Sequence, residues 1–381
     1  MFGKTRLSPR QTLFILHPAF VMSGILQAVN GPLMPSLAST FHWNDSRSGL
    51  LFLLYFLGSC TGPFVCHFRY SRTLAAAFLM MAVVCMGIAW ATPIFFLPLF
   101  YFLGLSNGTS TASVNLLVGR NYGPNCAPTL TLLNFTWSAG ALMAPLLAAP
   151  ILVSHSYRSV YMMVAALALS MSLLVATMLE DGPEPPPREN AASGSAKMAL
   201  IVLFSAIAFL EVGCENVSVA WMSTYLLRAS GTGIAVASAA TSLYWAGFVS
   251  ARALASVLLW RFPVKRVFYC ALALALTMTV TLIFFPSGWN VRPAVFLLGM
   301  ALGPIYPLLL SSLFARVERS EDSRWMLGFG SFGGSVLPWL TGHISASAGS
   351  LRTGLITVPT AVLLMGILFC FMPGRTKEEA R

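Results

Sequence analysis

Three ionisable side chains stand inside long apolar stretches of this chain: Glu211, Glu215 and Arg252. Charged residues make up only 9% of the 381 residues, and nearly all of the others fall between the apolar stretches. Placing an ionised side chain at the centre of a bilayer costs about 3 kcal/mol on insertion scales, so such residues are kept where they pair, meet water or do chemistry. These three residues are therefore the first candidates for a functional site.

The two acids are four residues apart, which places them on one face of a helix and about 6 Å apart along its axis. Two carboxyl groups this close in a low dielectric cannot both ionise cheaply, so one is expected to hold a proton and to be able to carry it. The simpler interpretation is a protonated carboxyl that hydrogen-bonds between helices. Arg252 is expected to have a structural or gating role, either near Glu211 or at the inner membrane surface.

Uncharged polar and aromatic side chains supply a second set of candidates. Amides bind hydroxyl groups and aromatic rings cover an apolar ring face without the cost of buried charge, which suits a sugar or polyol ligand. Each of them fits an interhelical hydrogen bond equally well, but together they indicate a hydrophilic cavity. The candidates for substrate contact are Gln27, Asn30, Asn107, Asn115, Asn134, Trp137, Asn216, Trp221, Tyr225, Tyr244 and Tyr306.

Twelve apolar segments have to position these residues. Hydrophobic residues make up 57% of the chain, and a segment of about 20 residues crosses the hydrocarbon core. Lipid leaves the backbone no partner outside a helix or a closed barrel, so the segments are predicted to be helices. Their predicted ranges are 12–38, 48–68, 73–92, 95–119, 127–153, 157–179, 198–226, 233–260, 265–286, 292–315, 324–347 and 351–373.

Charge in the loops predicts the orientation. Of the 23 Lys and Arg residues, seventeen fall on the side that holds both termini and five on the other, so both termini are expected in the cytoplasm. Residues 180–197 are rich in Pro, Gly and Ser and are predicted to form a cytoplasmic linker. This linker divides the chain into an N-terminal six-helix bundle, 1–179, and a C-terminal bundle with a short tail, 198–381.

Several motifs resemble the fucose and glucose symporter branch of the major facilitator superfamily. They are the Gly213-x-Glu215 pattern followed by Trp221 and Tyr225, Trp245-Ala-Gly247, and Gly303-Pro304-Ile-Tyr306-Pro307. The resemblance implies an all-α membrane protein of twelve transmembrane helices, in two six-helix bundles with pseudo-twofold symmetry. It implies secondary active transport of a neutral sugar or polyol by alternating access, coupled to H+ or Na+.

Two positions depart from that branch. Where proton-coupled members resemble one another in an Asp of the first segment and a Glu of the fourth, this chain has Gly31 and Thr111. Neither carries a proton, so coupling is expected to run through Glu215 and Glu211. Three alternatives stay open: an uncoupled sugar facilitator, an exporter of drugs or amphiphiles, and an organic-anion carrier that uses Arg252.

The sequence offers no sign of an enzyme, a cofactor or a metal site, because it has no Walker loop and no metal-spaced His or Cys set. The seven cysteines are interpreted as small packing residues. The net charge of +11 is spread over loops, so no nucleic-acid partner is expected. We expect a monomer in the plasma or inner membrane, with the bilayer, a small-molecule substrate and H+ or Na+ as its partners.

Overall fold

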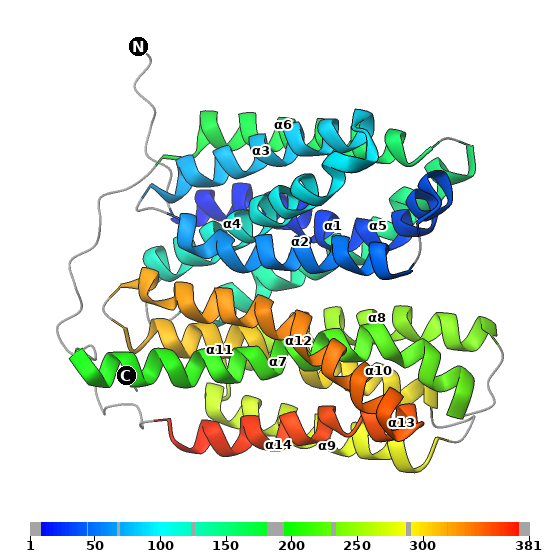
Figure 1. Ribbon diagram of the computed structural model, residues 1–381. Helices are drawn as coiled ribbons and strands as arrows, with labels where there is room; N and C mark the ends of the chain where they lie inside the picture. Colours follow the sequence, from blue (N-terminus) through cyan, green and yellow to red (C-terminus); the bar gives the residue numbers. More distant parts are fainter. Residues whose placement is uncertain are drawn as a thin grey trace. The chain divides into compact units, whose positions relative to one another are not determined.

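The computed structural model describes residues 9–43, 45–66, 69–122, 126–154, 156–180, 194–229, 234–286, 291–317 and 319–372. Within these ranges the regular structure is helical and contains no β-strand (Figure 1). Each of the twelve predicted segments coincides with one helix or with a helix pair, so the all-α prediction is confirmed. Most of the predicted linker, residues 181–193, lies outside the described residues.

Chain contacts divide the protein into two compact units, and the first comprises Met1–Tyr122 and Thr136–Pro186. In this unit α2 packs on α4, α3 packs on α6 and α4, and α1 packs on α4 and α6. Glycines let α2 and α4 approach closely, since a Cβ atom at Gly104 would collide with the carbonyl oxygen of Tyr55. The helices are α1 (Pro9–Phe41), α2 (Asp45–Val65), α3 (Tyr70–Trp90), α4 (Phe96–Tyr122), α5 (Ala127–Ser154) and α6 (Tyr157–Met178), with the 3-10 turn η1 (Pro93–Phe95).

The second unit comprises Gly123–Phe135, which includes the start of α5, and Pro187–Arg381. Its long helix α7 packs against α12, α14, α8 and α11, while α10 packs against α8 and α9. The helices are α7 (Gly194–Ala229), α8 (Ile234–Leu258), α9 (Val264–Phe284), α10 (Val291–Leu302), α11 (Ile305–Phe314), α12 (Arg324–Ala348), α13 (Leu351–Gly354) and α14 (Thr357–Cys370), with the 3-10 turn η3 (Ser320–Ser323).

Two predicted segments are interrupted rather than continuous. The segment 292–315 breaks into α10 and α11 at Gly303 and Pro304, and the segment 351–373 breaks into α13 and α14. Proline explains the first break, because Pro304 has no backbone N–H to continue the helical hydrogen-bond ladder. The break matters for the site, since its carbonyl groups become available to side chains.

Eight helices in the described residues are long and apolar enough to cross a membrane. Helices α2, α4, α8 and α12 do not meet that criterion over their described lengths. For α4 the reason is its polar content, because Ser106, Asn107, Ser110 and Asn115 all lie buried along it. Buried polar residues therefore lower the hydropathy of α4, as expected where a helix lines a functional site.

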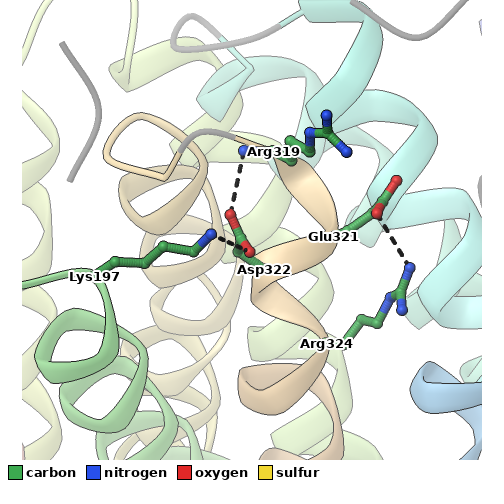
Figure 2. A network of polar contacts seen from close by, with 5 residues as sticks. All are labelled: Lys197, Arg319, Glu321, Asp322 and Arg324. Carbon is green, nitrogen blue, oxygen red and sulfur yellow. Dashed lines mark hydrogen bonds and ion pairs between the residues drawn. The ribbon is translucent and has the colours of Figure 1, made fainter. Parts of the chain in front are cut away.

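A group of charged residues lies where α7 begins and where η3 leads into α12 (Figure 2). Lys197 Nζ lies 2.7 Å from Asp322 Oδ1, and the Arg319 backbone N–H donates to Asp322 Oδ2 at 3.3 Å. Arg324 pairs with Glu321 at 3.3 Å. These contacts join the start of α7 to the start of α12 within the second unit.

Candidate functional site

The acidic pair lies on α7, which is continuous through both positions. Glu211 is fully buried and Glu215 is 9% exposed. Neither carboxyl oxygen of Glu211 has a hydrogen-bond partner within the described part of the chain. Leaving an ionised carboxyl group buried in this way costs several kcal/mol, so the buried position favours the protonated, neutral form of Glu211.

Arg252 on α8 is also buried, at 2% exposure. Its Nε donates to the carbonyl oxygen of Gly303 at 2.8 Å, and its Nη1 donates to the carbonyl oxygen of Asn134 at 3.1 Å. The guanidinium carbon lies 4.2 Å from the ring centroid of Phe248, which is a cation–π distance. These contacts hold the guanidinium on backbone carbonyls rather than on Glu211, and they explain how a charged side chain persists at this depth.

The surroundings of the three charges come from α7, α8 and α11. Tyr244 is fully buried and its hydroxyl has no hydrogen-bond partner among the described residues. Tyr306 on α11 is half-buried. Glu211, Glu215 and Arg252 interact electrostatically with one another and with both tyrosines. The second unit thus brings Tyr244 and Tyr306, both predicted from the sequence, together with the charged cluster.

A different cluster forms in the first unit from Gln27, Tyr55 and Asn107. The Tyr55 hydroxyl donates to Gln27 Oε1 at 3.0 Å, and Asn107 Nδ2 lies 2.9 Å from both Gln27 Oε1 and the Tyr55 hydroxyl. Asn107 Oδ1 is buried and has no hydrogen-bond partner within the described residues. This cluster carries no charge and keeps one amide acceptor open.

Gln27 and Asn107 were predicted from the sequence as substrate contacts, and Tyr55 was not. A tyrosine in an apolar segment carries no signal by itself, because it fits a packed core equally well. The available signal was the spacing of small residues: Gly58 and Gly62 on α2 and Gly104 and Gly108 on α4 each stand four apart. Such spacing favours close helix packing, which would have placed α2 beside Asn107.

Other predicted residues of the first unit and of the start of α5 bond to neighbouring groups. Asn30 Oδ1 accepts a hydrogen bond from the Tyr161 hydroxyl at 3.0 Å. Asn115 and Asn134 donate to carbonyl oxygens of their own helices, those of Thr111 and Leu130. Asn115 Oδ1 is left buried without a partner in the described residues. Trp137 on α5 is half-buried.

In the second unit three predicted residues of α7 bond to backbone. Asn216 donates to the Val212 carbonyl oxygen at 2.8 Å, and Trp221 Nε1 donates to the Pro338 carbonyl oxygen at 3.0 Å. The Tyr225 hydroxyl lies 2.9 Å from the Leu282 carbonyl oxygen. Among the described residues, no group of three or more His, Cys, Asp or Glu side chains is placed to hold a metal ion.

Long apolar helices with a few buried charges define a polytopic helical membrane protein. The family model for the Major Facilitator Superfamily matches residues 16–326, and the chain belongs to this superfamily of membrane transporters. The predicted family and fold class are thereby confirmed.

Individual relatives are more distant. The chain is 22% identical to the glucose/mannose transporter GlcP of Bacillus subtilis (strain 168) in an alignment 392 residues long, gaps included. This alignment covers 97% of this chain and 96% of that protein. It is 33% identical to the sodium-dependent glucose transporter 1 of Rattus norvegicus over 148 residues, 36% of this chain and 30% of that protein. The solved structure of the E. coli fucose:proton symporter FucP matches with a TM-score of 0.78 at 16% identity, over 96% of this chain and 99% of that chain.

Proposed function

We propose that this protein moves a neutral sugar or polyol across the membrane by alternating access. The observation that carries the proposal is the similarity to GlcP, which extends over 97% of the chain and therefore includes both halves. In this proposal the bundles 1–179 and 198–381 rock against each other, so that the substrate site opens to one side at a time.

The cluster of Gln27, Tyr55 and Asn107 supports a sugar as the substrate. A ligand hydroxyl is a donor as well as an acceptor, so it can satisfy the open Asn107 Oδ1 without bringing any charge into the protein. An amphiphile would leave that buried acceptor unsatisfied, which favours the sugar over the drug exporter. The wider predicted set stays part of the proposal: Asn30, Asn115, Asn134, Trp137, Asn216, Trp221, Tyr225, Tyr244 and Tyr306.

Glu215 and Glu211 are proposed as the coupling residues, with a proton as the coupling ion. Support comes from their burial beside Arg252 and from the unpartnered carboxyl oxygens of Glu211. Arg252 is bonded to backbone carbonyl groups, which favours a gating or structural role over binding of an anionic substrate. Sodium is the other candidate ion, because the rat relative is named as a sodium-dependent glucose transporter.

An uncoupled sugar facilitator is the second candidate function. The observation that favours it is the absence of acids at Gly31 and Thr111, the two positions where proton-coupled members of the branch carry them. The two candidates differ in one property: only a coupled transporter accumulates sugar against its gradient when an ion gradient is imposed.

The deciding experiment uses the purified protein in liposomes with labelled glucose, mannose and fucose as probes. Coupled transport predicts accumulation above the external concentration when the lumen is alkaline or free of sodium, and the effective gradient identifies the ion. Equilibration without accumulation would identify the facilitator. If none of these sugars entered while apolar compounds raised the melting temperature, the sugar proposal would be wrong.

We further propose a monomer in the plasma or inner membrane, with both termini in the cytoplasm and no catalytic activity. The bias of Lys and Arg toward one set of loops supports this orientation. Reporter fusions test it: a fluorescent protein that folds only in the cytoplasm should be bright at either end of the chain. Dark fusions at both ends would show that the termini lie on the opposite side of the membrane.

A further inference from the structure

Pro307, just after the break between α10 and α11, removes the helical donor of the Gly303 backbone carbonyl. In a continuous α-helix the N–H of residue 307 would bond to the carbonyl oxygen of residue 303. Residue 307 is proline and has no N–H, so the Gly303 carbonyl oxygen has no partner within its own helix. Arg252 on α8 replaces the missing donor: its Nε donates to the Gly303 carbonyl oxygen at 2.8 Å.

Glycines bring α8 close enough for this contact. A Cβ atom at Gly303 would lie 2.6 Å from the carbonyl oxygen of Phe248, and one at Gly299 would collide with that of Tyr244. The two backbones therefore nearly touch along α8 and α10, and Arg252 follows Phe248 by one helical turn. The guanidinium is thus placed on the broken turn by the packing of the helices.

The charge of Arg252 is balanced from α7. Its carbonyl partners are neutral, so its buried positive charge is stabilised electrostatically by Glu211 and Glu215. A cluster of one cation and two carboxyl groups is least costly to bury when one carboxyl is ionised and the other keeps its proton. Because Glu211 is fully buried and neither of its oxygens is bonded, it is the group that keeps the proton.

The other titratable groups near Glu211 are Cys214 on α7, Tyr244 on α8 and Tyr306 on α11. Helices α12 and α14 also pack on α7, and within the described residues they add no charged group to these interactions. A thiol and two phenols are neutral in the pH range where carboxyl groups titrate. Glu215 then supplies the carboxylate that balances Arg252, so the proton on Glu211 is the variable charge next to the guanidinium.

We propose that Arg252 is a positioning residue that acts as a proton-dependent latch on the α10–α11 break. While Glu211 keeps its proton, the guanidinium stays on the Gly303 carbonyl and fixes the angle of the break. When Glu211 releases its proton to water, the new carboxylate draws the guanidinium away, and the broken turn is free to bend. The latch rests on the proposed coupling role of the acids, and it names the element that their protonation moves.

A double-mutant cycle tests the latch, because Pro307→Ala supplies the missing N–H to Gly303 while Arg252→Met removes the donor from α8. At pH 5.5 we expect Arg252→Met to lower the melting temperature by about 5 °C and the double variant to recover about half of that loss. The quantity that depends on pH is the gain from Pro307→Ala in the chain that keeps Arg252. It should be small at pH 5.5, where Arg252 already donates to the Gly303 carbonyl, and at pH 8.5 it should be about as large as in the Arg252→Met background. In a Glu211→Gln background, which cannot lose a proton, the gain from Pro307→Ala beside Arg252 should stay small at both pH values.

Pro359→Ala in α14 is the matched control, because this buried proline of the same unit lies on a helix that Arg252 does not bond. It should give no recovery in the Arg252→Met background. Equal recovery from both proline variants would overturn the latch, as would a gain from Pro307→Ala that is the same at pH 5.5 and 8.5 in the chain that keeps Arg252.

Sugar exchange in liposomes provides the second readout. Arg252→Met should slow glucose exchange about tenfold or more, and the rescued double variant should exchange at a rate that no longer depends on pH. The melting experiment needs no substrate, so the latch can be confirmed or overturned even if the protein transports none of glucose, mannose and fucose. Failure of the proposed function and failure of the latch are thereby distinguished.

Discussion

The two compact units solve the problem of buried polarity in different ways. In the first unit Gln27, Tyr55 and Asn107 bond to one another, carry no charge and leave one amide acceptor open. In the second unit Glu211 and Arg252 are ionisable groups buried without a hydrogen bond between them. The acid has no hydrogen-bond partner within the described residues, and the arginine donates to backbone carbonyls. We propose that the first cluster exchanges hydrogen bonds with the ligand and that the second changes its charge.

This contrast suggests a division of labour. A neutral hydrogen-bonding cluster can accept a polyhydroxylated ligand with no net change in charge, because hydroxyl groups replace the partners that are lost. A cluster with a variable proton can respond to an ion gradient, because its burial cost changes with the proton. Substrate recognition is thus expected mainly in the first unit and coupling in the second.

The largest expected effect comes from Glu215→Gln. If the second unit holds the coupling site, Glu215→Gln leaves Glu211 as the only carboxylate that can balance Arg252, so Glu211 stays ionised and carries no proton. This variant should therefore lose accumulation of glucose against its gradient and keep counterflow exchange, because exchange needs no net movement of the ion. Uptake driven by an imposed pH gradient, measured beside exchange in the same liposomes, checks the result. Glu180→Gln, an exposed acid at the end of α6, is the control and should behave as the native chain. Loss of exchange together with accumulation would make Glu215 a ligand contact.

The next effect is expected in the first unit. Asn107→Ala removes both amide contacts and the open acceptor, so glucose affinity should fall about tenfold to a hundredfold, since each lost hydrogen bond costs about 1 to 1.5 kcal/mol. Coupling should survive, so any sugar that enters should still accumulate. Binding measured by intrinsic fluorescence checks the affinity. Asn121→Ala, an exposed amide on the same helix, is the matched control. Unchanged affinity in Asn107→Ala would remove the first unit from substrate recognition.

Gly31→Asp adds an acid to the first unit and tests whether an acid there changes the pH dependence of transport. Gly31 is exposed and a Cβ atom there meets nothing within 4 Å, so the variant should fold. Its carboxyl group should change the pH dependence of glucose exchange by a few fold while leaving exchange at its optimum near the native rate. Exchange recorded from pH 5 to pH 8.5 gives the profile, and Gly31→Asn separates charge from size. Identical profiles for the two variants would show that position 31 is not part of any ion pathway.

The smallest expected effect comes from the ion pairs of Figure 2. Both Lys197 and Asp322 are largely shielded, and Asp322→Asn should lower stability by about 0.5 to 1 kcal/mol, a loss of about 2 °C in melting temperature. The difference should shrink in 1 M salt, where the Debye length is about 3 Å. Transport should be unchanged. A loss of transport would assign these pairs a role in the conformational cycle.

Some of this arrangement was readable from the chain alone. The acids of α7 stood out because a charge inside an apolar segment is expensive and rare, and the helices followed from the demand that lipid places on the backbone. The motif around Gly303, Pro304 and Pro307 was also visible. Its meaning was not, because the donor that the second proline removes is replaced from α8, 51 residues earlier in the chain.

Contacts between helices account for the rest. Tyr55 joins Asn107 only because α2 and α4 pack through glycines, and Asn30 finds Tyr161 across 131 residues of sequence. Spacing along one helix cannot predict such pairs, since they depend on which faces meet. The charges and the amides are therefore visible in single helices, while their partners depend on how the helices pack.

The most direct test of the division of labour is to record sugar and proton movement together. Liposomes that contain the native protein and a pH-sensitive dye should acidify inside when glucose is added outside. Asn107→Ala should show the same number of protons per glucose at lower affinity, and Glu215→Gln should take up glucose without acidification. Glucose entry without any pH change in the native protein, or loss of acidification at full glucose affinity in Asn107→Ala, would contradict the assignment of substrate to one unit and proton to the other.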